Sequence, residues 1–536
     1  METIIVVGSG ASGVHFALSL LEKGYKVTML DVGYQKEDVL HPNDNINDLK
    51  SNLHDPVSYF LGKNFEAFIP PDNNSEYYGI PPSKNHVFCE PPRFSFSSNG
   101  FSPLFSFARG GLAETWTGGS YPLNEIELND FPFSYSEIEP FYEKVADRIG
   151  ISGAKDDLES FYPFHNYIMP GHDLDPNSRF LLSKYSSKNK YFNEKYNFYM
   201  GRSRVALLTQ DKNNRKSCNS RGRCLWGCPG DSFYTPSITL EKCKSHTNFN
   251  YIPDMHVRYF KYNSENHISG VVAKSIKTNE EHEYSLDKLV LAAGTLSSSN
   301  IFLESIYRKT NEIVKLNGLM DNRQILVPFI NLRMIGKPTK LDYYQYHQLA
   351  ICIGSDNLKD NIHGQITTCK AAMIHPIIKS VPCDYKTALY IFNIFHSALG
   401  IINVNFSDSR RNENFLSLET SENSNEPRLT ICYQPRSNEH PKIVRTIRTL
   451  KKALLRLSCV VAPFMTHTRP MGASVHYSGT IPMSEEKIPF TTSKYCQSHD
   501  FRNLYFVDGT TFPFLPAKNL TFTLMANSIR VAENAF

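Results

Sequence analysis

The sequence has little that would indicate a membrane-spanning or nucleic-acid-binding protein. Its 57 Lys and Arg residues nearly balance 53 Asp and Glu residues, and no basic cluster stands out, which argues against nucleic acid as a partner. The longest apolar run covers only 388–402 and contains Asn393 and His396. Because this run is too short to cross a bilayer, no transmembrane segment is expected. We predict a buried helix there, with a membrane-surface helix as the alternative.

A secretory leader is also not visible at the start of the sequence. Neither a basic region nor an apolar stretch with a small-residue cleavage site precedes the first motif. The 11 cysteines, an odd number, then favour reduced thiols in a cytoplasm. We therefore predict a cytoplasmic protein, with peripheral attachment to a membrane as the alternative. A chain of 536 residues is too long for one hydrophobic core, so two domains are expected.

What the sequence does have, at its start, is the pattern of a dinucleotide site. The β-branched run 4–7 predicts a parallel strand buried on both faces. A glycine-rich turn at 8–13 and an apolar-periodic helix follow, and a second strand ends at Asp31. Glycines, strand, helix and acid together have the arrangement that binds a dinucleotide.

Each residue of the turn has a separate expected role. Gly8 permits the tight turn, Gly10 lets a pyrophosphate approach the backbone, and Gly13 lets helix and strand pack closely. The helix N-terminus, with Ala11 and Ser12, offers free N–H groups to the phosphates. Asp31 is expected to accept hydrogen bonds from a ribose.

Five segments spread along the chain resemble, in order, the motifs of the GMC (glucose–methanol–choline) oxidoreductase family. They are 8–13 with Asp31, 110–119, 289–303, 476–483 and 507–526. The resemblance implies an α/β fold in which a Rossmann-like FAD-binding domain is assembled from discontinuous segments. A substrate domain with an antiparallel sheet and helices is expected beside it. The cofactor implied is FAD rather than NAD.

The resemblance also implies domain boundaries. The FAD-binding domain is predicted at 1–40, 85–124, 201–309 and 463–536, a lid or insertion at 41–84, and the substrate domain at 125–200 and 310–462. Apolar spacing within 440–458 predicts an amphipathic helix in the substrate domain.

Further cofactor-binding residues are implied by the matching motifs. They are Gly110, Gly111, Thr115, Trp116, Val257, Ala293, Gly294, Asp508, Gly509, Asn519 and Leu520. Val257 resembles the residue whose backbone meets adenine, with Met255 as the alternative register. Some family members attach FAD through a histidine in the 110–119 loop, where this chain has Thr115. We therefore predict non-covalent FAD.

Family members pair a histidine with a second histidine or an asparagine near the flavin. HTRPMGAS at 467–474 resembles a damaged form of the motif, whereas HYSGTIPM at 476–483 matches it residue for residue. We predict His476 as the base and Asn519, at the family's usual separation, as its partner. The alternatives are that Asn519 serves only as a helix N-cap and that His467 lies at the surface or supports the site.

Cys218, Cys224 and Cys228 lie within one Gly- and Pro-containing stretch. Their spacing resembles a hinge of certain GMC dehydrogenase subunits that hold an iron–sulfur cluster, for which thiolates are suitable ligands. A redox disulfide and reduced thiols in a structural loop are the other two interpretations, and the last is preferred.

The predicted function is FAD-dependent oxidation of a CH–OH group in a sugar or sugar-like alcohol. The electron acceptor, oxygen or a carrier protein, stays open, with a dehydrogenase favoured. The alternatives are a non-redox lyase or decarboxylase on the same fold, and a dehydrogenase subunit whose iron–sulfur cluster passes electrons to a partner. A binding protein that retains FAD is a third possibility.

Overall fold

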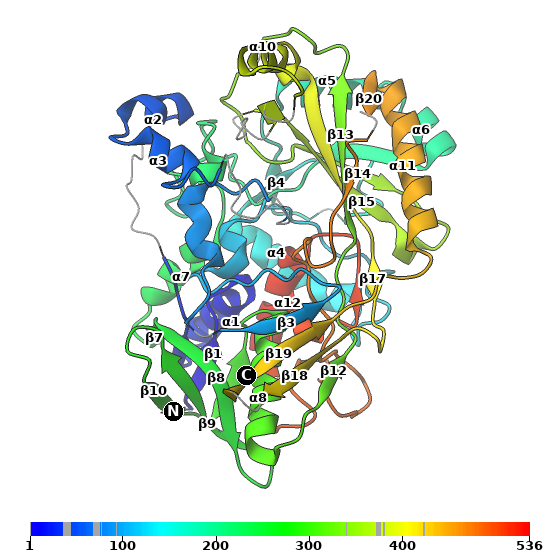
Figure 1. Ribbon diagram of the computed structural model, residues 1–536. Coiled ribbons are helices and arrows are strands. Elements are labelled where there is room, and N and C mark those ends of the chain that lie inside the picture. Colours follow the sequence, from blue (N-terminus) through cyan, green and yellow to red (C-terminus); the bar gives the residue numbers. More distant parts are fainter. Residues whose placement is uncertain are drawn as a thin grey trace.

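The computed structural model describes residues 2–35, 44–67, 76, 78–92, 94–163, 165–338, 340–370, 377–378, 381–421, 424–461 and 464–536. Part of the predicted lid therefore lies outside the described residues. In Figure 1 a parallel sheet and both chain termini occupy the lower half, and a large antiparallel sheet occupies the upper half. The predicted α/β class with a second, antiparallel part is confirmed.

The parallel sheet has the strand order β22-β11-β1-β2-β7. Its strands are β1 (Ile4–Val7), β2 (Val27–Leu30), β7 (Phe249–Ile252), β11 (Lys288–Leu291) and β22 (Leu504–Phe506). Strands from both ends of the sequence and from its middle thus meet in one sheet, as a domain assembled from discontinuous segments requires.

Both faces of this sheet are buried, which explains why β1 shows no polar alternation. One face of β1 packs in a core with helices α1 (Ala11–Glu22), α4 (Tyr135–Ile149), α7 (Pro236–Lys244) and α12 (Thr521–Asn534). The other face packs against α8 (Thr295–Thr310) and the antiparallel sheet of β8 (Met255–Tyr262), β9 (Ile268–Ser275) and β10 (Glu281–Ser285).

A four-stranded sheet shares this second core. It has the order β12-β18-β19-β3, from β12 (Lys315–Asn317), β18 (Phe415–Ser421), β19 (Ser424–Cys432) and β3 (Phe96–Asn99). Leu316, Leu416 and Ile431 pack with side chains of β1 and α8. This packing favours placing 315–319 and 415–433 with the cofactor half, outside the substrate domain predicted at 310–462.

The upper half contains a sheet of order β20-β13-β16-β15-β14-β6, with β21 beside β13. Its strands are β6 (Phe198–Arg202), β13 (Gln324–Asn331), β14 (Leu349–Ile353), β15 (Ile362–Thr368), β16 (Leu399–Asn405), β20 (Cys459–Val461) and β21 (His467–Thr468). Its apolar face packs against α5 (Pro176–Ser186), α6 (Asn189–Tyr196) and α11 (Glu439–Arg456), the helix predicted at 440–458. The opposite face of the sheet is turned toward the cofactor half.

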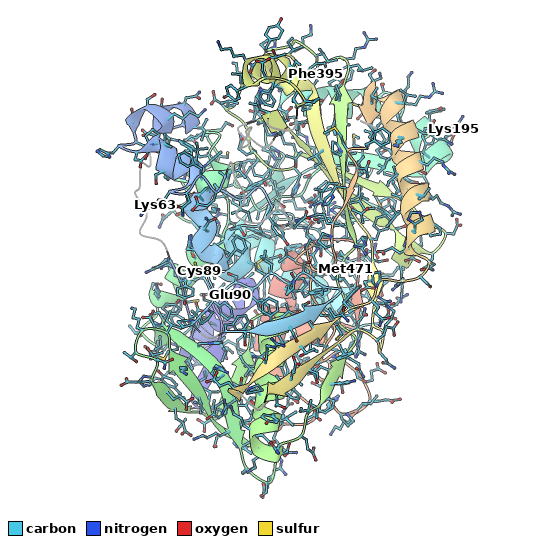
Figure 2. The ribbon with its side chains drawn as sticks, viewed as in Figure 1. Lys63, Cys89, Glu90, Lys195, Phe395 and Met471 are labelled. Atoms are coloured by element: carbon cyan, nitrogen blue, oxygen red, sulfur yellow. The ribbon has the colours of Figure 1, made fainter. Side chains whose placement is uncertain are left out.

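The helix predicted across 388–402 is wrong in extent. Helix α10 (Tyr385–Phe395) stops at Phe395, labelled in Figure 2, and β16 begins at Leu399. Gly400 pairs with Phe329 of β13. A Cβ at position 400 would lie 2.3 Å from the Phe329 ring, so this part of the run needs glycine to pair as a strand with β13. The helix is also less buried than predicted, because Tyr390 is 68% exposed. Within the described residues, every helix is too short or too polar to cross a membrane.

The remaining helices α2 (Ile46–Asn52) and α3 (Pro56–Leu61) lie in the stretch predicted as a lid. They pack on the cysteine-containing loop rather than on the parallel sheet. The Ile46 amide donates to the Arg221 carbonyl at 3.1 Å, and the Tyr59 hydroxyl donates to the Trp226 carbonyl at 3.3 Å.

Candidate active site

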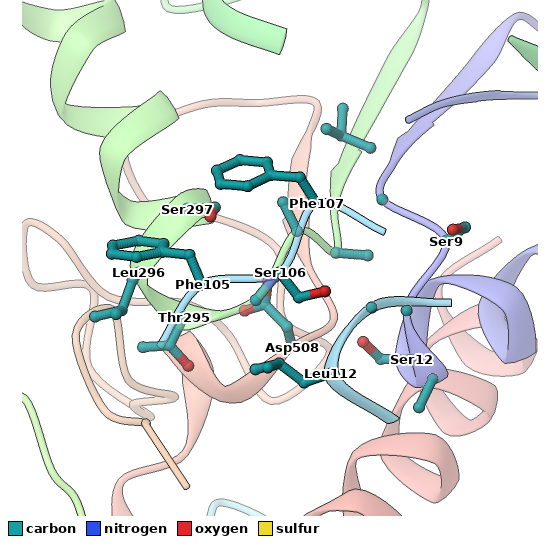
Figure 3. Close-up of a pocket in the computed structure, with 18 of the residues that line it drawn as sticks. Ser9, Ser12, Phe105, Ser106, Phe107, Leu112, Thr295, Leu296, Ser297 and Asp508 are labelled. Carbon is teal, nitrogen blue, oxygen red and sulfur yellow. The ribbon is translucent and has the colours of Figure 1, made fainter. Parts of the chain in front are cut away.

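A cavity that opens to solvent runs along the carboxyl ends of the parallel strands. Figure 3 shows part of its lining, including Ser9 and Ser12 of the first turn, Phe105 and Phe107, and Asp508. The position is the one at which sheets of this class bind ligands.

The turn before α1 is shaped for a pyrophosphate. A Cβ on Gly13 would lie 2.1 Å from the Gly8 carbonyl oxygen, so this position requires glycine for close packing. A Cβ on Gly10 would meet nothing nearer than 4.0 Å and would point into open space. The N-terminus of α1 has no side-chain cap and no acidic residue in its first turn. Its free N–H groups are therefore available to an anionic ligand.

Asp31 lies in the cavity lining with one carboxylate oxygen already engaged. Oδ2 accepts hydrogen bonds from the Ser9 hydroxyl and, at 2.9 Å, from the Tyr251 hydroxyl. Burial raises the pKa of Asp31 to about 6, although these two donors favour the ionised form. A ribose that donated hydrogen bonds to this carboxylate would lower that pKa.

Most of the sequence-predicted cofactor residues line this one cavity. They are Gly8, Gly10, Ala11, Ser12, Asp31, Gly110, Gly111, Val257, Ala293, Gly294, Asp508, Gly509 and Leu520. Met255, the alternative to Val257, lines it as well, because the two side chains lie on the same strand.

Of the predicted cofactor residues, Gly13, Thr115, Trp116 and Asn519 do not line this cavity. The Thr115 hydroxyl turns back to donate to the Leu112 carbonyl at 3.1 Å. The Trp116 indole donates to the Tyr234 carbonyl at 2.8 Å. The loop thus reaches the cavity with its glycines, Leu112 and Ala113, and directs its larger polar side chains elsewhere.

Several lining residues were missed by sequence reasoning. Phe105 and Phe107 enter from a segment that carries no motif, and Ser106 lies between them (Figure 3). The only local signal was the Phe-Ser-Phe alternation itself, which any half-buried extended segment would show.

The structure brings His476 and Asn519 together at one end of the cavity. The Asn519 Nδ2 and His476 Nε2 atoms lie 3.3 Å apart. His476 lines the cavity, and Asn519 immediately precedes Leu520 and Thr521, which also line it. Burial lowers the pKa of His476 to about 4, so the imidazole is neutral near pH 7.

Asn519 does not cap the following helix. The N-cap position of α12 is Leu520, and no side chain caps that helix. The Asn519 Oδ1 atom instead accepts a hydrogen bond from Gln365 Nε2 at 2.5 Å. Gly119 makes room for this contact, because a Cβ there would lie 2.8 Å from both of those atoms.

The polar face of the large sheet lies beside this pair. His363 and Gln365 of β15 are opposite Asn405 and Asn403 of β16, and all four share the face away from the apolar core. Within the described part of the chain, His363 Nε2, Asn403 Oδ1 and Asn405 Nδ2 have no hydrogen-bond partner. Burial also lowers the pKa of His363 well below its usual range, so this face is uncharged at neutral pH.

The competing histidine motif lies apart from the pair. His467 is exposed, and its Nε2 lies 3.1 Å from Glu76 Oε2. Arg469, which replaces the motif's histidine, donates to Glu76 Oε1 at 2.6 Å and covers the Tyr78 ring. Glu76 and Tyr78 belong to the predicted lid, so His467 and Arg469 act as its contact points.

The three clustered cysteines lie in an aromatic environment with Phe233 and Tyr344. Burial raises the pKa of Cys218, and that of Cys224 still further, so both thiols keep their protons at neutral pH. Among the described residues, no group of three His, Cys, Asp or Glu side chains is arranged to hold a metal ion. All 11 cysteines are free thiols.

A parallel sheet, a glycine-lined cavity at its carboxyl edge and a neutral histidine at the end of that cavity are features that FAD-dependent oxidoreductases share. The model of the GMC oxidoreductase family matches residues 410–528. The match covers the C-terminal segment that includes His476 and Asn519, and the lining of the cavity suits FAD.

Known proteins resemble the chain over nearly its full length. It is 19% identical to 6'''-hydroxyparomomycin C oxidase of Streptomyces lividus, over 99% of this chain and 90% of that protein. The solved structure of pyridoxine 4-oxidase from Mesorbium loti has a TM-score of 0.60 at 13% identity, covering 99% of each chain. Formate oxidase has a TM-score of 0.63 at 10% identity, covering 99% of this chain and 97% of the other. At these identities the two structures show the shared fold alone.

Proposed function

We propose that this enzyme oxidises the CH–OH group of a neutral, sugar-like alcohol, with His476 as the base and Asn519 as its partner. The observation that carries the proposal is the 3.3 Å contact between the two side chains at the end of the FAD cavity. The remaining steps follow from the protonation state of the histidine and from the surroundings of the pair.

His476 suits proton abstraction because it is neutral. With a pKa of about 4, nearly all of the imidazole holds a lone pair at pH 7. Its Nε2 atom would take the hydroxyl proton of the substrate, while the Asn519 amide orients the substrate oxygen by a hydrogen bond. FAD, when bound, supplies the acceptor for the hydride that leaves the carbon.

FAD would be held by the N-termini of two helices and by the carboxylate of Asp31. The N–H groups of α1 would bind the pyrophosphate, and Asp31 would bind a ribose. Leu520 and Thr521 bring the N-terminus of α12 to the other end of the cavity. Its dipole would favour negative charge on the reduced ring. Thr115 stands where some family members have the histidine that attaches FAD, and its lack of a suitable nitrogen supports non-covalent FAD.

An uncharged polar surface beside the pair supports a sugar-like substrate. Gln365, His363, Asn403 and Asn405 offer amide and imidazole groups without a formal charge. Buried polar atoms that lack partners are costly unless water or a ligand pairs with them, and several hydroxyl groups would do so. Two relatives are named for hydroxyl-bearing compounds, and all three are named oxidases, which favours oxygen over a carrier protein as acceptor.

Anaerobic mixing with a panel of alcohols tests the proposal. The flavin absorbance is followed with methyl β-D-glucopyranoside, pyridoxine, benzyl alcohol and sodium gluconate. We expect bleaching by the neutral polar compounds, more slowly by benzyl alcohol and least by the gluconate anion. Conversion of a compound without bleaching would instead identify a lyase, and bleaching by none would contradict the proposal.

A further inference from the structure

Asn322 lies two residues before β13 and is 1% exposed, and its amide orientation is fixed by backbone carbonyls. Its Nδ2 donates to the Phe406 carbonyl at 2.7 Å and to the Pro516 carbonyl at 2.9 Å. Carbonyl oxygens only accept hydrogen bonds, so the nitrogen of the amide must be on this side. The oxygen of the amide must therefore be on the other side.

That oxygen faces the catalytic histidine. Asn322 Oδ1 and His476 Nδ1 lie 2.9 Å apart. An amide oxygen cannot donate, so Nδ1 of the ring carries the proton. In a neutral imidazole the second nitrogen, Nε2, then holds the lone pair.

The hydrogen bonds on the other side of the ring, through Asn519, run in the same direction. Because Nε2 has no proton, the group of Asn519 that faces it at 3.3 Å must be the donating Nδ2. Asn519 Oδ1 then faces Gln365 and accepts from its Nε2 at 2.5 Å. Two backbone carbonyls thus set the direction of every hydrogen bond from Asn322 to Gln365.

We infer that Asn322 is a positioning residue, which holds the proton of His476 on Nδ1 so that Nε2 is the basic atom. The inference rests on the proposed function, because it assigns the atom that takes the substrate proton. A histidine in such a position is often oriented by a carboxylate, which also stabilises the protonated ring. Asn322 orients the ring without adding charge, and the base therefore stays neutral over a wide pH range.

The surroundings of the His476 ring also support an orienting residue without a charge. Two ionisable groups that interact with His476 are His363 of β15, which is neutral, and Asp321, which precedes Asn322. The Asp321 carboxyl accepts from the Gly472 amide at 2.6 Å and from the Ser474 hydroxyl, and burial raises its pKa to about 7. Neither group bonds to the imidazole nitrogens.

Nuclear magnetic resonance of ¹⁵N-histidine-labelled holoenzyme tests the inference without any substrate. The His476 signals are assigned by their loss in His476→Ala. At pH 7 we expect a proton on Nδ1 and none on Nε2. A proton on Nε2, or a mixture of the two forms, would overturn the inference even if the enzyme were fully active.

Two substitutions extend the test to catalysis. Asn322→Leu removes the acceptor for Nδ1–H, and we expect flavin reduction to slow about 10- to 100-fold with FAD still bound. Asn322→Asp keeps an acceptor toward Nδ1, and because its other oxygen would face the Phe406 and Pro516 carbonyls, that oxygen must carry a proton. We therefore expect Asn322→Asp to keep the proton of His476 on Nδ1 and to retain more of the rate than Asn322→Leu, a rescue that general loosening of the site would not produce.

Asn331→Leu is the matched control, because Asn331 is a fully buried asparagine at the far end of β13, the strand that follows Asn322. Its Nδ2 bonds to Asn177 Oδ1 at 2.8 Å, far from the pair. It should lower stability without changing the His476 signals or the rate of flavin reduction. If His476→Ala abolishes reduction while Asn322→Leu leaves the His476 signals and the rate unchanged, the inference fails and the proposed function stands. If His476→Ala still reduces flavin normally, the proposed function itself fails.

Discussion

The two ends of the cavity are built in different ways. At the nucleotide end, one turn, one helix and Asp31 are close together in sequence, and recognition depends mostly on backbone groups. At the catalytic end, the contacting side chains come from Asn322, Gln365, His476 and Asn519. The first end depends on local conformation, whereas the second depends on how β15 and three loops that are distant in sequence pack together. Substitutions at the two ends should therefore have separable effects on FAD content and on rate.

The largest effect is expected from Gly10→Val at the nucleotide end. The new side chain would point into the space where a pyrophosphate would lie, since a Cβ there meets no protein atom within 4.0 Å except the Ala292 carbonyl oxygen at that distance. We expect folded apo-protein without flavin absorbance. Gly10→Ala, with a smaller side chain, should retain part of its FAD. Full FAD content in Gly10→Val would mean that the pyrophosphate lies elsewhere.

Gly119→Ala should affect the catalytic end of the cavity while leaving FAD binding at the nucleotide end unchanged. The added Cβ would lie 2.8 Å from both Asn519 Oδ1 and Gln365 Nε2 and would push the two amides apart. We expect flavin reduction to slow about tenfold, a cost of about 1.4 kcal/mol, with normal FAD content. Gly230→Ala is the control, because its Cβ would meet only ordinary contacts at 3.5 Å or more. Equal rates in the two variants would show that the amide contact does not matter.

Asp31 should make FAD binding depend on pH. Burial raises its pKa from 3.8 to about 6, so the apo-protein loses stability as pH rises through that window, in which the folded form holds the proton and the unfolded chain has released it. Binding of a ribose favours the ionised carboxylate. Affinity for FAD, measured by fluorescence titration, should therefore weaken about tenfold between pH 7 and pH 5.

The matched variant for this effect is Asp31→Asn. It should bind FAD less tightly at pH 7, and the change between pH 7 and pH 5 should largely disappear. A wild-type affinity that is constant across this range would contradict the assigned role of the carboxylate.

The smallest effect is expected in the cysteine-containing loop. Cys228 accepts a hydrogen bond from the Phe233 amide at 3.4 Å and belongs to no metal-holding group in the described part of the chain. Cys228→Ser should retain FAD and reduce it within about twofold of the wild-type rate, because surface and loop substitutions usually cost little. Stoichiometric iron in the anaerobically purified wild-type protein, lost in the variant, would restore the iron–sulfur interpretation.

The difference between the two ends also determined what the sequence could predict. The Gly8–Gly13 turn and Asp31 are close in sequence, so their spacing alone indicates a shared site. His476 and Asn519 were predicted from motifs that resemble a family, and the structure does bring them within contact. Asn322 and Gln365 were missed, because they reach the pair only through the register of β13 and β15, which no local pattern encodes.

The sequence also predicted poorly which way side chains point and where a helix gives way to a strand. Thr115 and Trp116 belong to the correct loop, but their hydrogen bonds to backbone carbonyls turn them away from the cavity. The apolar run 388–402 has no period that distinguishes a buried helix from a buried strand. Its division at Phe395 follows from Gly400 fitting against Phe329, which is a tertiary contact.

The central claim is that His476 is the base, and anaerobic stopped-flow reduction of the flavin in His476→Ala tests it most directly. The alcohol that bleaches the wild-type enzyme fastest is used at pH 7, and FAD content is measured in parallel. Removal of a general base predicts a rate about 10²- to 10⁴-fold lower with FAD still bound. An unchanged rate in a variant that retains FAD would contradict the account.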